Sequence, residues 1–139
     1  MVYASHFSHD FHLAKGFGWT IGETSFSWKS LIEAKDKEID RLNGLYINTL
    51  ASNNVDTIMG RGVITGPNSV EVDGKTYTAE KILVAVGGWP SMPEIPGIEH
   101  AITSNEAFHL EDQPKRVVIV GGGYIAVEFA GIFAGMGLK

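Results

Sequence analysis

A glycine cluster behind an apolar run is the part of this sequence with the clearest chemistry. Residues 116–120 read Arg-Val-Val-Ile-Val, and Gly121, Gly122 and Gly123 follow directly. Gly121 permits a tight turn out of a strand, Gly123 lets backbone approach a phosphate, and Ala126 permits close helix–sheet packing. The N-terminus of the next helix offers free N–H groups and a positive dipole end. The pattern predicts a dinucleotide pyrophosphate site, and the alternative is a strand–turn–helix unit that only packs.

The elements that must position this turn are predicted from periodicity. Apolar spacing indicates helices over 1–15, where no residue caps the start, and from a Ser27 cap to about residue 51. The second helix carries one apolar stripe that we expect to be buried. Alternating segments predict short strands, and Asp73-Gly74 predicts a type I′ hairpin turn. These strands are expected at 55–58, 62–64, 69–72 and 76–78.

Two apolar runs, 81–86 and 117–120, are predicted to be strands, and the first has the composition of a strand buried on both faces of a parallel sheet. Between them, Pro90, Pro93 and Pro96 predict an extended linker, because each proline fixes its own φ and disfavours helix in the residue before it. A short helical turn is expected over 104–110. The best domain boundary therefore lies between about residues 88 and 114.

Composition excludes several classes of partner. The chain has 139 residues, a formal net charge of −5 and no cysteine. An acidic chain without a basic cluster argues against nucleic acid and against an anionic membrane surface. The first residues lack the pattern of a signal peptide, so a cytoplasmic location is expected. His6, His9 and His12 recur every three residues but drift around a helix without supporting ligands, so no metal site is expected.

Four landmarks in a consistent order carry a family resemblance: 26–28 (Phe-Ser-Trp), 41–46, the segment 87–97 with its spaced prolines, and the turn 121–131. Together they resemble the two-dinucleotide flavoprotein disulfide reductases, also called class I pyridine nucleotide-disulfide oxidoreductases, and within them the glutathione reductase branch. The resemblance covers essentially the whole chain.

The resemblance implies an α/β fold. Residues 1–88 would be the latter part of a first FAD-binding, Rossmann-like segment with a small β-hairpin, and 89–114 a linker with a helical turn. Residues 115–139 would begin an inserted NAD(P)-binding Rossmann domain, as its first β–α unit. The sequence stops where the second strand of a βαβ unit should begin, so we expect it to be an internal fragment.

The resemblance assigns four residues to the FAD site: Gly62, Ala85, Val86 and Gly87. Val86 stands where many relatives have threonine, so a side-chain hydrogen bond at that position is lost. From the pattern alone, Gly62 can instead be a strand-crossing glycine, and 85–87 a plain buried strand end.

Seven residues are assigned to the NAD(P) site: Gly121, Gly122, Gly123, Tyr124, Ile125, Ala126 and Glu128. By resemblance, Tyr124 is the ring that covers the flavin until the nicotinamide displaces it, and Glu128 lies near the nicotinamide carboxamide. The pattern alone also allows Tyr124 to be a surface aromatic and Glu128 to complement the helix dipole.

By resemblance, Tyr46 lines the pocket for glutathione disulfide, whereas its spacing alone makes it a core aromatic of the apolar stripe. The implied parent is a homodimeric NAD(P)H-driven glutathione-disulfide reductase that uses FAD and serves cell redox homeostasis. No catalytic residue is expected in this chain, because the cysteine pair and the acid–base histidine of the family would lie outside it.

Three questions stay open from the sequence. A reductase of trypanothione or glutathione amide matches the same motifs, and a nucleotide-binding redox sensor without catalysis is the alternative from another class. The choice of NADPH or NADH depends on residues after the next strand, which lie beyond Lys139.

Overall fold

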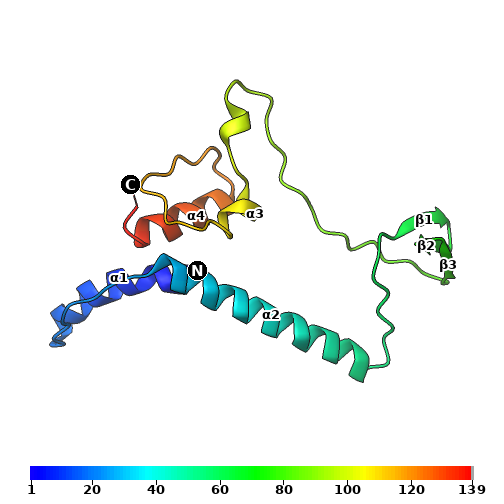
Figure 1. Cartoon of the computed structure of the whole chain (residues 1–139), viewed down its shortest axis with the longest axis horizontal. Coiled ribbons are helices and arrows are strands. Elements are labelled where there is room, and N and C mark those ends of the chain that lie inside the picture. The colour runs from blue at the N-terminus through cyan, green and yellow to red at the C-terminus, as the bar shows by residue number, and fades with distance from the viewer. Residues whose placement is uncertain (139) are drawn as a thin grey trace. The chain divides into compact units, whose positions relative to one another are not determined.

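The computed structural model describes residues 1–138 (Figure 1). The chain divides into two compact units, one formed by Met1–Ile39 with the residues from Met92 onward, the other by Asp40–Ser91. In chain order the elements are α1 (Val2–Ala14), the 3-10 helix η1 (Lys15–Phe17), α2 (Trp28–Ser52), β1 (Val63–Gly66), β2 (Ser69–Val72), β3 (Lys75–Thr78), the 3-10 helix η2 (Ile98–His100), α3 (Ser104–Ala107) and α4 (Tyr124–Gly135).

The helix α2 begins where the sequence predicts. The Ser27 hydroxyl accepts a hydrogen bond from the Ser30 backbone N–H at 3.2 Å, which is the expected N-cap. The stripe is buried only near this end, where Trp28 is 5% exposed. Further along, Tyr46 and Leu50 are exposed, so the prediction of one buried face holds only for the first turns.

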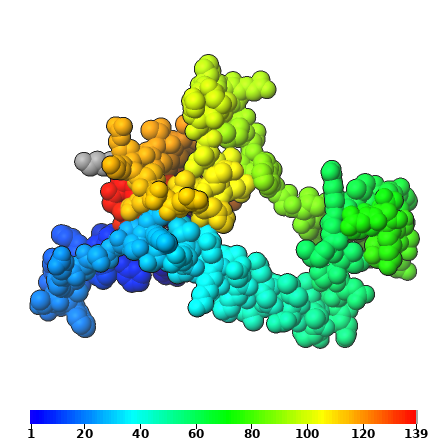
Figure 2. Space-filling view, in the orientation of Figure 1, coloured from blue at the N-terminus to red at the C-terminus, as the bar shows by residue number. Residues whose placement is uncertain are grey.

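The core of the first unit is a small aromatic cluster from three helices. Trp28 of α2 packs with Ala107 of α3 and with Phe129 and Phe133 of α4. The Trp28 ring stacks on Phe133 at 6.3 Å between centroids, and its Nε1–H donates to the Leu110 carbonyl at 2.8 Å. Figure 2 shows the yellow and orange segments of this unit resting on the cyan start of α2.

The helix α4 ends in a Schellman motif. Gly137 has a φ of +84°, its N–H donates to the Ala134 carbonyl, and the Leu138 N–H donates to the Phe133 carbonyl. Leu138 also packs against the aromatic cluster. These contacts fix the C-terminal end of the helix that the glycine turn begins.

The second unit contains an antiparallel three-stranded sheet of order β1-β2-β3. Asp73 and Gly74 both have positive φ, +48° and +80°, as a type I′ turn requires. Val72 pairs with Lys75 across this turn. The hairpin prediction is therefore confirmed.

Three predicted strands are wrong. The segments 55–58, 81–86 and 117–120 are not in any ladder, and Leu83 and Val118 are each 90% exposed. A β-strand forms only when the backbone N–H and C=O groups of the segment make hydrogen bonds with a neighbouring strand. No such neighbour for these segments lies among residues 1–138.

The first helix matches its predicted range but does not bury its apolar side chains. Met1 stands at its N-cap without a side-chain hydrogen bond, and Ser5 is its one buried residue. Tyr3, Phe7 and Leu13 are exposed. In the described part of the chain, none of the helices combines the length and apolar character that a membrane span requires.

Candidate nucleotide-binding site

The glycine turn before α4 is open, and only one of its glycines is required by backbone conformation. Gly121 has a φ of +120°, which a residue with a side chain rarely adopts. Gly123 has an ordinary extended backbone, with φ −71° and ψ 167°. A Cβ added at Gly122 or Gly123 would meet no atom within 4 Å. Residues 1–138 thus give no steric reason for glycine at 122 and 123, and the space beside them is open.

Among residues 1–138, no acceptor is found for the backbone donors at the N-terminus of α4, beside this space. The Val127 N–H closes the first turn onto the Gly123 carbonyl at 3.1 Å, and no side chain caps the helix at Gly123. The N–H groups of Tyr124, Ile125 and Ala126 precede that first bond and therefore have no intrahelical acceptor. Free N–H groups at a helix N-terminus, next to glycines without side chains, fit a diphosphate.

The side chains of the predicted NAD(P) site lie along the first turns of α4. Tyr124 is 76% exposed and Ile125 is 43% exposed. Ala126 is half-buried and Glu128 is exposed. The seven predicted residues thus form one continuous turn and helix start, with the Tyr124 ring exposed.

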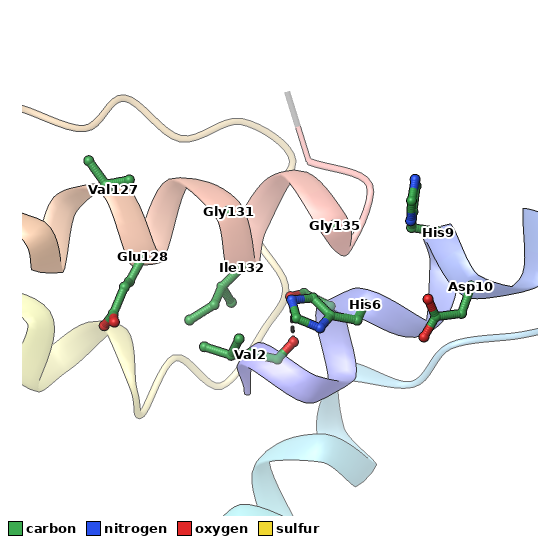
Figure 3. A pocket seen from close by; sticks show the side chains of 10 residues that line it. Val2, His6, His9, Asp10, Val127, Glu128, Gly131, Ile132 and Gly135 are labelled. Carbon is green, nitrogen blue, oxygen red and sulfur yellow. Dashed lines mark hydrogen bonds between the residues drawn. The ribbon is translucent and has the colours of Figure 1, made fainter. Parts of the chain in front are cut away.

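A cleft of about 500 Å³ lies between α1 and α4 (Figure 3). It is lined by Val2, Ser5, His6, His9, Asp10, Val127, Glu128, Gly131, Ile132 and Gly135. Glu128 lines this cleft and Tyr124 does not. The carboxylate can accept hydrogen bonds from an amide there. In the part of the chain described here, no three His, Asp or Glu side chains are placed to hold a metal ion.

The residues predicted to bind FAD and the disulfide substrate lie in the second unit, on three separate segments. Tyr46 is on α2 and is 67% exposed, so the described chain does not bury it as a core aromatic. Gly62 precedes β1, and an added Cβ would make an ordinary contact with Val70 at 3.4 Å.

The third segment, 85–87, follows β3. Val86 is 87% exposed, and Gly87 has a φ of +72°. A buried strand end, the alternative reading of this segment, is not what the structure shows. The assignments to FAD and to the disulfide stay predictions.

Sequence reasoning did not single out Ser5, Ser8 or Gly135. These residues bring α1 against α4, and the Ser8 hydroxyl donates to the Gly135 carbonyl at 2.5 Å. The available signal was a pair of glycines, Gly131 and Gly135, four residues apart on an apolar helix. Glycine has a low helix propensity, so its presence there indicates close packing or a functional reason.

Comparisons with known proteins find similar sequences and a similar structure. The chain is 53% identical over 98% of its length to "Glutathione reductase, chloroplastic/mitochondrial" from Pisum sativum. It is 49% identical over 99% of its length to glutathione reductases from a Nostoc species and from Burkholderia cepacia. Among solved structures, the HOCl-induced flavoprotein disulfide reductase RclA from Escherichia coli matches with a TM-score of 0.74 and 27% identity over 100% of the chain.

The chain spans 25% to 31% of the lengths of these four proteins. The expected α/β, Rossmann-like fold class is confirmed by the family match and by the structural neighbour. The sequence pattern of the family "Pyridine nucleotide-disulphide oxidoreductase" matches residues 3–139. The chain belongs to the pyridine nucleotide-disulphide oxidoreductase family.

Proposed function

We propose that this chain is part of an FAD-dependent, NAD(P)H-driven enzyme that reduces glutathione disulfide and so maintains cell redox homeostasis. The observation that carries the proposal is the identity of 49% to 53% with three proteins named glutathione reductase, over 98% to 99% of the chain. The open glycine turn supports the nucleotide part of the proposal independently.

The role of each residue is the one that the family resemblance implies, and each group has the chemistry that the role requires. Backbone N–H groups at 124–126 would bind the diphosphate of NAD(P)H, and the glycines 121–123 leave room for it. The Tyr124 ring is exposed, and a nicotinamide ring would displace it on binding. The Glu128 carboxylate would orient the nicotinamide by accepting a hydrogen bond from its carboxamide.

The second unit would contribute to the flavin and to the substrate. Gly62 and the segment 85–87 would hold FAD through backbone, since neither carries a polar side chain. When bound, FAD supplies the capacity to accept a hydride and pass electrons to a disulfide. Tyr46 would offer a phenol hydroxyl to the disulfide substrate.

The finer assignments belong to the same proposal. NADPH is the expected nucleotide and NADH the alternative. The intact enzyme would be a cytoplasmic homodimer that binds neither nucleic acid nor membrane. Residues 1–88, 89–114 and 115–139 would be the FAD segment, the linker and the start of the NAD(P) domain.

The test uses the intact polypeptide that contains this chain. We expect a yellow protein with a flavin absorption spectrum that oxidises NADPH or NADH only when glutathione disulfide is added. Trypanothione disulfide and glutathione-amide disulfide, assayed in parallel, should be poorer substrates. A better rate with either would assign the enzyme to that substrate. Nucleotide binding without disulfide-dependent oxidation would contradict the proposal and indicate a sensor.

A further inference from the structure

Helix α4 lies very close to α1 at the C-terminal turn of α4. A Cβ built on Gly135 would lie 2.5 Å from the Ser5 carbonyl oxygen and 2.8 Å from the Ser5 Cβ. One of these atoms is backbone and the other is fixed to it, so neither can rotate away. The α1–α4 seam, defined as Ser5, Ser8 and Gly135, therefore tolerates no side chain at position 135 in its present geometry.

A hydrogen bond also crosses the seam, at its exposed side. Ser5 is 4% exposed, and its hydroxyl is satisfied within α1 by the Val2 carbonyl at 2.7 Å. The Ser8 hydroxyl reaches across to the Gly135 carbonyl. That carbonyl belongs to the last turn of α4, where acceptors have no intrahelical donor.

Backbone conformation does not explain the glycine. Gly135 is helical and is not among the glycines with positive φ. Alanine has the higher helix propensity, so a glycine there weakens the helix unless contact requires it. Gly131 is the matched case on the same helix: it lines the same cleft, yet an added Cβ would meet nothing within 4 Å.

The seam and the nucleotide turn are the two ends of one rigid element. The helix α4 has 12 residues, which at a rise of 1.5 Å per residue is a length of about 18 Å. The face that lines the cleft carries Glu128 near one end and Gly135 at the other (Figure 3). A displacement at the seam therefore moves Glu128 and the N–H donors at 124–126 with it.

From this geometry we infer that Gly135 is a positioning residue, whose missing side chain seats α4 against α1 and so fixes where the N-terminus of α4 holds the nucleotide. The inference rests on the proposed binding of NAD(P)H at that end. A misplacement of 1 Å at a reacting centre can lower a rate about a hundredfold, so a contact this tight is sufficient to matter.

The experiment compares Gly135→Ala, Gly131→Ala and Ser8→Ala in the intact flavin-loaded polypeptide. We expect Gly135→Ala to raise the KM for NAD(P)H and its Kd about tenfold, while the KM for the disulfide and the flavin content stay unchanged. Gly131→Ala should leave all four quantities within about twofold. Ser8→Ala removes only the hydrogen bond and should raise the nucleotide KM about two- to fivefold.

Each outcome decides the inference. Equal nucleotide KM and Kd in Gly135→Ala and Gly131→Ala would overturn it. A Gly135→Ala protein that keeps both KM values but loses flavin and kcat together would show a purely structural role. If that variant does not fold, Ser8→Ala decides, and an unchanged nucleotide KM there would refute the inference. Failure of the wild-type protein to bind nucleotide is a separate result, because it refutes the proposed function instead.

Discussion

At the scale of single residues, the structure separates a glycine that the backbone conformation requires from glycines that it does not require. Gly121 has a positive φ, whereas Gly123 adopts a conformation open to any residue and has free space around its Cβ position. This distinction is not visible in the sequence, where the three glycines look alike. A substitution at Gly123 is therefore expected to raise the stability of α4 while it weakens nucleotide binding.

The substitution that tests both effects is Gly123→Asp. Asp is among the best N-cap residues and its charge suits the helix dipole, so we expect α4 to gain up to about 1 kcal/mol. The same carboxylate would meet the diphosphate and weaken NAD(P)H binding at least about tenfold, or about 1.4 kcal/mol. Thermal unfolding and calorimetric titration of the intact polypeptide measure the two effects.

The matched control is Gly123→Asn, which caps equally well and carries no charge. It should keep only the capping part of the gain, a few tenths of a kcal/mol, and lose less nucleotide affinity than the Asp variant. An Asp variant that binds NAD(P)H as tightly as wild type would place the diphosphate somewhere other than at this turn.

At the scale of elements, helix ends are set by local hydrogen bonds. The four-residue helix α3 is stabilised by a capping box, in which the Glu106 carboxylate accepts from the Thr103 hydroxyl at 2.6 Å and from the Thr103 N–H at 2.7 Å. Thr103 in turn accepts from the Asn105 N–H at 3.2 Å. This helix supplies Ala107 to the aromatic cluster, so its start affects the packing around α4.

The capping box predicts a pH dependence. The hydrogen bond from the Thr103 side chain, followed by that from its backbone, lowers the pKa of Glu106 below its usual value of 4.5. Because the folded-state pKa is the lower one, the contribution to stability is complete above 4.5 and disappears as the pH falls through the folded value. An NMR titration should therefore give Glu106 a midpoint below 4.5.

Two variants check the cause of this shift. Thr103→Val removes the hydroxyl and should bring the Glu106 midpoint back toward 4.5. Glu106→Gln keeps an acceptor that does not titrate, so the decrease in stability attributed to Glu106 on the acid side should disappear. An unshifted Glu106 in the wild-type protein would show that the capping box does not persist in solution.

At the scale of the whole molecule, several apolar segments are exposed in residues 1–138. Leu83 and Val118 are each 90% exposed and Val86 is 87% exposed. The relatives are three to four times longer than the matched segment, since the chain spans 25% to 31% of their lengths. Parallel strands are buried on both faces only when other strands and helices surround them.

The prediction at this scale concerns residues 1–139 produced alone. The chain contains no cysteine, so no thiolate is present to attack a substrate disulfide. We expect no nucleotide-dependent reduction of glutathione disulfide, with a glutathione reductase assayed in parallel as the positive control. Any turnover above the no-protein blank would contradict the proposal that the cysteine pair required for reduction lies outside this chain.

The sequence by itself determined the features that depend on neighbours along the chain. The start of α2 at Ser27, the Asp73-Gly74 hairpin and the glycine turn into α4 all follow from local hydrogen bonds and φ preferences, and all three are present. The fold class followed from the order of the landmarks and is borne out by the family match.

Only the tertiary structure decided what depends on partners distant in sequence. The runs 81–86 and 117–120 have the composition of strands, but a ladder needs a second strand, which composition cannot supply. The contact of Gly135 with Ser5 joins residues 130 positions apart, and no spacing rule connects them. Helix packing is a matter of which surfaces meet, and that is settled only when the whole chain is folded.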